Sequence, residues 1–196
     1  MTGKIRIISG QWRGRRIPVS DHPELRPTGD RARETLFNWL GPKVIGSRCL
    51  DLFAGSGALG LEAASRGAAE VILVERDARL AGALRELLEQ WPGSHGVRVE
   101  QADALQWLGT KQAPVDIVFA DPPFGRGMQV GTLESLKTAS CCTDQTLVYV
   151  ESELDEEPDL AAAVERDWVC LKHKRQGRVV LRLLKLADSA HGAGEI

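Results

Sequence analysis

Residues 49–60 read Cys-Leu-Asp-Leu-Phe-Ala-Gly-Ser-Gly-Ala-Leu-Gly, and this stretch decides the fold. Its apolar start, 49–53, predicts a short strand, and 58–66 predicts a helix rich in Ala and Leu. Between them, glycines at 55, 57 and 60 form a G-x-G-x-x-G turn, which lets a ligand approach the backbone closely. A strand, a glycine turn and a helix in this order predict a nucleotide-type cofactor loop. The alternative is an ordinary flexible turn.

Strands and helices alternate along the rest of the chain. Further strands are expected at 70–74, 97–99, 115–120 and 146–150, and helices at 77–90 and around 133–137. Residues 168–171 and 177–184 form a closing antiparallel pair, because their connection is too short for a helical crossover. This pattern predicts an α/β fold with a doubly wound, mostly parallel twisted sheet and an antiparallel last strand. Ligands then bind at the carboxyl ends of the strands.

The first 42 residues precede this pattern and form an extension of their own. Ile5, Ile7 and Ile8, a turn, and the run 15–19 predict a β-hairpin. A helix follows, capped by Thr28 or Asp30, and ends at Gly41-Pro42. We therefore expect three parts: an N-terminal hairpin and helix over 1–42 that packs on the main domain, a cofactor-binding domain over 43–186, and a flexible tail over 187–196.

Acidic residues follow three of the expected strands. Glu75 can accept both ribose hydroxyls of an adenosine, or it can be a capping or surface acid. Asp103 can accept from an adenine amino group or cap a helix. Asp51, before the glycine turn, suits a cofactor with a cationic amino-acid end, which favours S-adenosylmethionine. NAD is disfavoured because Tyr149, the single tyrosine, has no lysine four residues on, and no catalytic histidine–acid pair stands out.

Asp121-Pro122-Pro123-Phe124 comes directly after the strand at 115–120. The two prolines stiffen the backbone and leave carbonyls free to accept hydrogen bonds. Asp121 adds a carboxylate acceptor and Phe124 a flat apolar face. These groups together suit an amino group held by acceptors while its planar ring stacks alongside, as methylation of an exocyclic base nitrogen requires.

Basic residues gather near both ends of a chain whose net charge is −2. Five cations lie within the first twenty residues, with Trp12 among them, and a second basic run lies between Lys172 and Lys185. A local basic patch favours a polyanionic partner such as RNA. The alternative is a solvated charged face. The acidic stretch 151–159 has no assigned role.

Composition sets further bounds. The 196 residues fit one domain, and 43% hydrophobic with 27% charged residues is typical of globular proteins. No apolar run approaches the roughly 20 residues of a membrane span. The start of the chain lacks the apolar core of a signal peptide, so we expect a cytoplasmic protein.

The four cysteines and four histidines show no metal-ligand spacing, so no metal is expected. A monomer is the default expectation for the oligomeric state.

The order of these motifs resembles that of the class I S-adenosylmethionine-dependent methyltransferases, which have a Rossmann-like fold. Four further segments resemble the bacterial 16S rRNA guanine-N2 methyltransferase family (RsmD type). These segments are 6–14 (RIISGQWRG), 25–28 (LRPT), 31–40 (RARETLFNWL) and 149–152 (YVES). The likeness covers nearly the whole chain except its tail.

The resemblance implies methyl transfer from S-adenosylmethionine to the N2 amine of one guanine in 16S rRNA, within the small ribosomal subunit or its assembly intermediate. The implied catalytic residues are Asp121, Pro122, Pro123 and Phe124. The implied cofactor residues are Asp51, Phe53, Ala54, Gly55, Ser56, Gly57, Glu75, Arg76, Asp103, Ala104 and Asp121. The expected RNA-binding residues are Arg6, Trp12, Arg13, Arg15, Arg16, Arg26, Thr28 and Arg31. The alternatives are an amino-methyltransferase acting on DNA adenine or protein glutamine, and a non-catalytic RNA-binding assembly factor.

This chain differs from the wider amino-methyltransferase pattern at two positions. Asp121 stands where adenine-N6 enzymes commonly have Asn, and Phe124 stands in place of Tyr. A carboxylate accepts at both oxygens, whereas an amide also donates, so Asp suits a base edge made of N–H donors. Guanine presents N2–H₂ and N1–H side by side, which favours guanine over adenine.

Overall fold

The computed structural model describes residues 4–18, 29–123 and 127–187. Two short strands, β1 and β2, pair antiparallel as a separate hairpin, and seven more strands form one sheet. The strands are β1 (Lys4–Arg6), β2 (Arg16–Pro18), β3 (Arg48–Asp51), β4 (Glu70–Glu75), β5 (Val97–Gln101), β6 (Ile117–Ala120), β7 (Leu147–Glu153), β8 (Trp168–Gln176) and β9 (Val179–Leu186).

The strand order in the sheet is β5-β4-β3-β6-β7-β9-β8. The first five strands of this order run parallel, and β9 inserts antiparallel between β7 and β8. The predicted mostly parallel sheet with an antiparallel last strand is therefore confirmed. The hairpin connection places β8, rather than the last strand, at the edge of the sheet.

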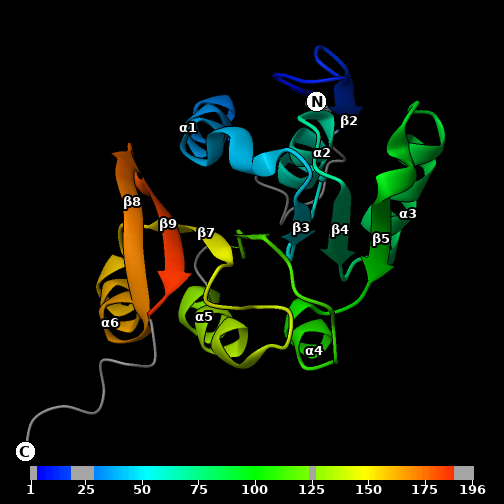
Figure 1. Cartoon of the computed structure of the whole chain (residues 1–196). Coiled ribbons are helices and arrows are strands. Elements are labelled where there is room, and N and C mark those ends of the chain that lie inside the picture. The colour runs from blue at the N-terminus through cyan, green and yellow to red at the C-terminus, as the bar shows by residue number, and fades with distance from the viewer. Residues whose placement is uncertain (1–3, 19–28, 124–126, 188–196) are drawn as a thin grey trace, which may run out of the picture.

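Helices cover both faces of the sheet (Figure 1), as a doubly wound fold requires. One face carries α1 (Asp30–Leu40), α2 (Ala58–Ser65) and α3 (Ala78–Glu89), and the other carries α4 (Ala104–Leu108), α5 (Met128–Thr138) and α6 (Glu157–Asp167). Two 3₁₀ turns, η1 (Gly41–Val44) and η2 (Ser94–Gly96), precede β3 and β5. Because the central strands are covered on both faces, they are almost continuously apolar.

The structure contains two helices and part of a strand that the sequence pattern did not predict. The pattern assigned no helix to α4 or α6, and it ended β8 at Leu171, five residues early. The acidic stretch 151–159 contributes the start of α6, where negative charge is favourable. Glu157 pairs there with the buried Arg182 of β9, and Asp155 pairs with Arg178 in the β8–β9 turn.

The β1–β2 hairpin packs on the amino edge of the sheet. Helices α2 and α3 each run back from a strand's carboxyl end, so their last residues lie at the opposite, amino edge. The Gln11 amide donates to the Ser65 carbonyl of α2 at 2.8 Å. Gly10, at φ +83°, lies so close that an added Cβ would be 1.7 Å from that carbonyl oxygen. Figure 1 shows the hairpin at the end of the molecule from which the arrows of β3 and β4 point away.

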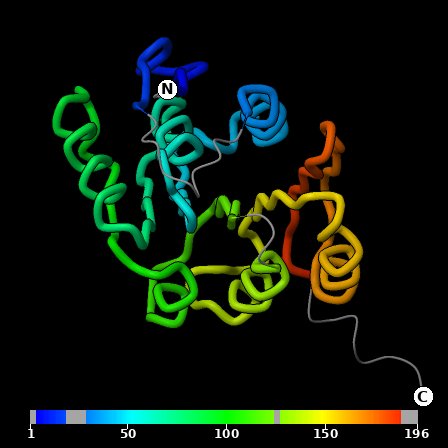
Figure 2. Tube along the Cα trace, turned by 180° about the vertical axis from the view of Figure 1, so that it is seen from behind, coloured from blue at the N-terminus to red at the C-terminus, as the bar shows by residue number. Residues whose placement is uncertain are grey.

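A buried acid fixes the hairpin to the two helices beside it. The Glu62 carboxylate of α2 accepts from the amides of Ile8 and Ser9 at 2.8 and 3.0 Å. The fully buried Arg33 of α1 lies 3.5 Å from the same carboxylate and donates to the Arg6 carbonyl at 3.0 Å. The hairpin, α1 and α2 are therefore joined by one polar cluster as well as by a common apolar core. Figure 2 shows the three elements together from behind.

Two further findings concern membranes and thiols. Within the described residues, no helix is both long and apolar enough to cross a membrane. Cys49, Cys141, Cys142 and Cys170 are all free thiols. Burial raises the pKa of Cys49 and Cys142 to about 12, so both remain protonated and unreactive at neutral pH.

Candidate functional site

The glycine turn after β3 leads directly into α2. Gly55 and Gly57 have φ values of +52° and +78°, and Gly57 is the N-cap residue of the helix. The turn is held by the Gly57 amide on the Ala54 carbonyl at 2.6 Å and by the Ala54 amide on Val74 of β4 at 3.0 Å. These backbone conformations favour glycine, so the sequence forms a rigid loop whose amides surround the start of a helix.

Gly60 has a packing role. An added Cβ would lie 2.2 Å from Cδ2 of Leu73 and 3.2 Å from Oδ2 of Asp51. A side chain here would push α2 away from the sheet and shift the whole loop. The third glycine of the motif therefore sets the closeness of helix and strand, in agreement with its usual part in such turns.

Asp51, the last residue of β3, is buried at 2% exposure behind this loop. Its Oδ2 accepts from the Gly60 amide at 2.9 Å. The pKa of Asp51 is raised to about 7, first by burial and then by the charges of Asp121 and Glu75, while the Gly60 hydrogen bond opposes the rise. Three carboxyl groups from neighbouring strands thus lie close enough to affect one another.

Glu75 ends the adjacent strand β4. One of its oxygens accepts from the Gly55 amide and the other from the Asp77 amide, each at 2.8 Å. The carboxylate is thereby fixed against the glycine loop, while each oxygen keeps a lone pair for another donor. Asp103, after β5, caps α4 through Oδ1 by accepting from Leu105 and Gln106, so the capping alternative is confirmed for that oxygen.

Asp121, Pro122 and Pro123 directly follow β6, and all four residues of that strand are buried. Beside this strand, Tyr149 of β7 donates its hydroxyl to Oε1 of Glu151 at 2.6 Å, and both side chains are buried. Burial, Glu151 and Asp121 all raise the pKa of Tyr149 well above its ordinary value, so the phenol stays protonated. Glu151 was not predicted as a site residue. Its i, i+2 spacing from Tyr149 on one strand was the signal that could have placed both side chains on the same face.

This collection of carboxylates suits a cationic ligand. Asp51, Glu75 and Asp121 come from β3, β4 and β6, which are neighbours in the sheet. Among the described residues, no group of three His, Cys, Asp or Glu side chains has the arrangement of a metal site. The acids, fixed beside a glycine loop, fit a nucleoside cofactor that carries positive charge at its amino-acid end.

The structure brings the predicted cofactor residues together. These residues are 51, 53–57, 75–76, 103–104 and 121, and they lie at or just after the ends of β3, β4, β5 and β6, four strands that are consecutive in the sheet. Parallel strands end at one edge, so residues far apart in sequence form one continuous site there. Of the predicted catalytic residues, Asp121, Pro122 and Pro123 are described at this edge, and Phe124 lies outside the described residues.

Comparison with known proteins places the chain in a family. Residues 5–185 match the family described as "Conserved hypothetical protein 95". The chain is 46% identical over 182 residues to "Ribosomal RNA small subunit methyltransferase D" of Escherichia coli K12, covering 93% of this chain and 90% of that protein. The protein of the same name from Haemophilus influenzae is 41% identical over 184 residues, covering 92% and 93%. The chain belongs to the small subunit methyltransferase D family.

A solved structure shows the same fold. The Escherichia coli protein yhhF superimposes with a TM-score of 0.81 at 46% identity, covering 94% of this chain and 98% of that one. The doubly wound sheet described above is thus the class I methyltransferase fold. The expected likeness to the methyltransferase D family is confirmed.

Within this methyltransferase D family member, the predicted RNA-binding residues separate into two places. Arg6, Arg13, Arg15 and Arg16 are exposed on the β1–β2 hairpin, which packs at the amino edge of the sheet, whereas Asp121 follows β6 at the carboxyl edge. Arg31 is exposed on the first turn of α1. Arg26 and Thr28 lie outside the described residues.

Trp12 requires a correction, because its side chain is 1% exposed and cannot stack on RNA. Its indole nitrogen donates to the Pro92 carbonyl at 2.8 Å, and its ring meets Trp91 edge-on with centroids 5.0 Å apart. Arg15 lies above Trp91, with its guanidinium carbon 5.4 Å from the ring centroid. The tryptophan that was predicted from sequence to bind RNA is instead the anchor of the hairpin.

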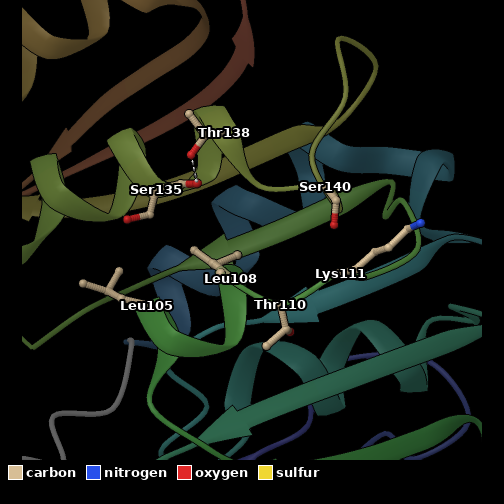
Figure 3. A pocket seen from close by; sticks show the side chains of 8 residues that line it. Leu105, Leu108, Thr110, Lys111, Ser135, Thr138 and Ser140 are labelled. Carbon is tan, nitrogen blue, oxygen red and sulfur yellow. Dashed lines mark hydrogen bonds between the residues drawn. The ribbon is translucent and has the colours of Figure 1, made fainter.

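A separate groove of about 480 Å³ lies at the amino edge, between the ends of α4 and α5 (Figure 3). It is lined by Leu105 and Leu108 together with polar residues such as Lys111 and Ser135. None of the predicted cofactor or catalytic residues that the structure describes lines it. The groove is therefore distinct from the carboxylate site.

Proposed function

We propose that the protein transfers a methyl group from S-adenosylmethionine to the N2 amine of one guanine in 16S rRNA, within the small ribosomal subunit or its assembly intermediate. The observation that carries the proposal is the convergence of Asp51, Glu75 and Asp121 beside the glycine loop, in a chain of the methyltransferase D family. We further propose that the protein acts in the cytoplasm, because its proposed substrate is ribosomal RNA, and that it is a monomer.

S-adenosylmethionine carries a methyl group activated by a sulfonium centre, and the residues present fit its other parts. Glu75 would accept the ribose hydroxyls, and Asp51 would lie near the cationic amino-acid end. The unused oxygen of Asp103 is an acceptor for the adenine amino group. Gly55, Gly57 and the backbone of their turn would surround the ligand, with Phe53, Ala54, Ser56, Arg76 and Ala104 completing the site.

Asp121 would perform the chemistry on guanine. The amino nitrogen of guanine is a weak nucleophile because its lone pair is delocalised into the ring. Hydrogen bonds from N2–H to the Asp121 carboxylate and the Pro122 carbonyl would orient the nitrogen and stabilise the positive charge that develops on it. Asp121 would then take the proton that the nitrogen loses, and Phe124 would stack on the base, worth about 1–3 kcal/mol.

Asp121 also supports guanine as the target. A carboxylate offers acceptors at both oxygens, and guanine presents adjacent N1–H and N2–H donors. The target base must be unstacked to reach a site at the edge of the sheet. Arg6, Arg13, Arg15 and Arg16 would bind phosphates of a more distant part of the large RNA, since such contacts position rather than specify.

The test is transfer of labelled methyl groups from S-adenosylmethionine to small subunits purified from cells that lack this gene. We expect N2-methylguanine at one position of 16S rRNA by nucleoside mapping. Label in adenine N6 or in a protein glutamine would instead support an amino-methyltransferase of another target. Failure to bind S-adenosylmethionine in calorimetry would support a non-catalytic assembly factor.

A further inference from the structure

The first part of the second basic run lies on the exposed edge strand β8. Residues 172–175 read Lys-His-Lys-Arg and belong to β8, and all four side chains are exposed. The run has no part in the carboxylate site. Lysines on a sheet edge can also serve to discourage pairing with other chains, so position decides which role these residues have.

Strand register places this run at the carboxyl edge. Ala120, the end of β6, pairs with Val150, which pairs with Arg182, which pairs with His173. Lys174 is one residue beyond this row, level with the residue that follows Ala120, namely Asp121. Three strand spacings, about 14 Å, separate the two positions. The lysines therefore lie on the same edge as the site, unlike the cations of the β1–β2 hairpin.

Helix α1 lies directly beside the end of β8. The Gln176 side-chain amide donates to Oγ1 of Thr35 at 2.8 Å and to the Arg31 carbonyl at 3.5 Å. Lys174 also reaches Oγ1 of Thr35, at 3.4 Å. Both views show the β8–β9 turn next to α1 (Figures 1 and 2). Arg31, at the start of α1, is thereby brought near the end of β8.

Lys172 shares this face of the sheet. On β9, its partner is Leu183 and the partner of Lys174 is Leu181, and both leucines belong to the core beneath α1. Among the described residues, neither lysine forms an ion pair with an acid. Asp155 pairs with Arg178 in the turn, Glu157 pairs with Arg182, and Glu34 is an exposed residue of α1.

We propose that Lys172, Lys174 and Arg31 form an RNA-binding surface that holds phosphates of the strand flanking the target guanine. The surface rests on the proposed function, and it assigns to the β8–β9 hairpin a role that the N-terminal cations cannot fill from the opposite edge. An RNA whose unstacked base reaches Asp121 must pass over this edge of the sheet. Lysine suits the contact, because its compact charge binds phosphate without reading sequence.

The experiment compares Lys172→Gln/Lys174→Gln with a matched control, Lys43→Gln/Lys111→Gln, which removes two exposed lysines at the amino edge. For each protein we would measure Kd for small subunits by sedimentation at several salt concentrations, KM and kcat for methyl transfer, and Kd for S-adenosylmethionine. We expect the β8 variant to bind subunits about tenfold more weakly and its KM to rise about tenfold. Its salt slope should fall by about 1.4, at roughly 0.7 per lost phosphate contact. Its kcat and cofactor Kd should match wild type, as should every value for the control.

Two outcomes separate this surface from the proposed function. Wild-type subunit affinity and salt slope in the β8 variant would overturn the surface and return its lysines to edge protection, while methyl transfer by the wild type would leave the proposed function standing. If the wild type transfers no methyl group, the proposed function fails. Weaker, less salt-dependent subunit binding by the β8 variant would still support the surface.

Discussion

At the residue scale, the buried carboxyl of Asp51 predicts that cofactor binding depends on pH. Burial and the charges of Asp121 and Glu75 raise its pKa to about 7, so Asp51 changes between its neutral and charged forms near neutral pH. A cationic ligand prefers the carboxylate, so binding must displace a proton at lower pH. We expect Kd for S-adenosylmethionine to rise about tenfold per pH unit below about pH 7, measured by calorimetry.

The same pKa has a consequence for stability of the free protein. Because the folded pKa lies above the ordinary value of 3.8, the folded protein binds more protons than the unfolded chain between about pH 3.8 and pH 7. The free energy of unfolding should therefore fall as pH rises through this range. Asp51→Asn keeps an oxygen acceptor for the Gly60 amide and should flatten both pH dependences. A Kd that is constant from pH 6 to 8 in the wild type would contradict this role of Asp51.

Asp121 offers a second test at the scale of one side chain. Asp121→Ala removes the acceptor that orients the amino nitrogen and takes its proton, so we expect kcat to fall by at least about 10²-fold. Affinity for S-adenosylmethionine should change little, because Asp51 and Glu75 remain. Asp144→Ala, at an exposed position of the loop before β7, is the matched control. Wild-type turnover by Asp121→Ala would refute the mechanism.

At the element scale, α2 connects the two edges of the molecule. It begins at Gly57 in the cofactor loop and ends at Ser65, on which the hairpin rests. Gly10 and Gly14 of the hairpin have nearly equal φ values, +83° and +84°, but only Gly10 approaches α2; nothing lies within 4 Å of a Cβ at Gly14. The pair separates backbone strain from contact between elements.

We expect Gly14→Ala to cost about 1–2 kcal/mol, the penalty of a left-handed backbone alone. Gly10→Ala adds a collision with the Ser65 carbonyl and should cost several kcal/mol more, measured by urea denaturation. Equal losses of stability in the two variants would show that the hairpin separates from α2 without cost.

At the scale of the whole molecule, the N-terminal hairpin and the sheet share one core. Ile5, Ile7 and Trp12 belong to the same buried cluster as Phe119 and Tyr149 of the central strands. The hairpin belongs to the extension over 1–42 that was expected to pack on the main domain, and its buried residues are part of this shared core.

We therefore expect one cooperative unfolding transition. Far-UV circular dichroism should report the sheet and helices, and tryptophan fluorescence should report both faces, since Trp12 and Trp91 lie on one and Trp107 and Trp168 on the other. The two midpoints should coincide. A separate early fluorescence transition would indicate that the extension unfolds independently.

Local pattern was enough to predict the sheet and to place four acids at one of its edges. A glycine turn needs particular backbone angles, an amphipathic or apolar run has a period, and parallel strands place their carboxyl ends together, so Asp51, Glu75, Asp103 and Asp121 could be assigned to one edge. Helix α6 was not predicted, because its first residues are acidic and include Pro158. Such a stretch resembles a loop in sequence, although acids and proline are both favourable in the first turn of a helix.

The sequence by itself thus determined the fold class and the acids at the carboxyl ends of the strands, because each follows from short-range rules. Only the tertiary structure decided which basic residues share an edge with Asp121. Exposure and edge depend on packing between distant segments. Trp12 is buried on Trp91 and Pro92, and the hairpin rests at the far edge, whereas strand pairing carries Lys174 to the near one.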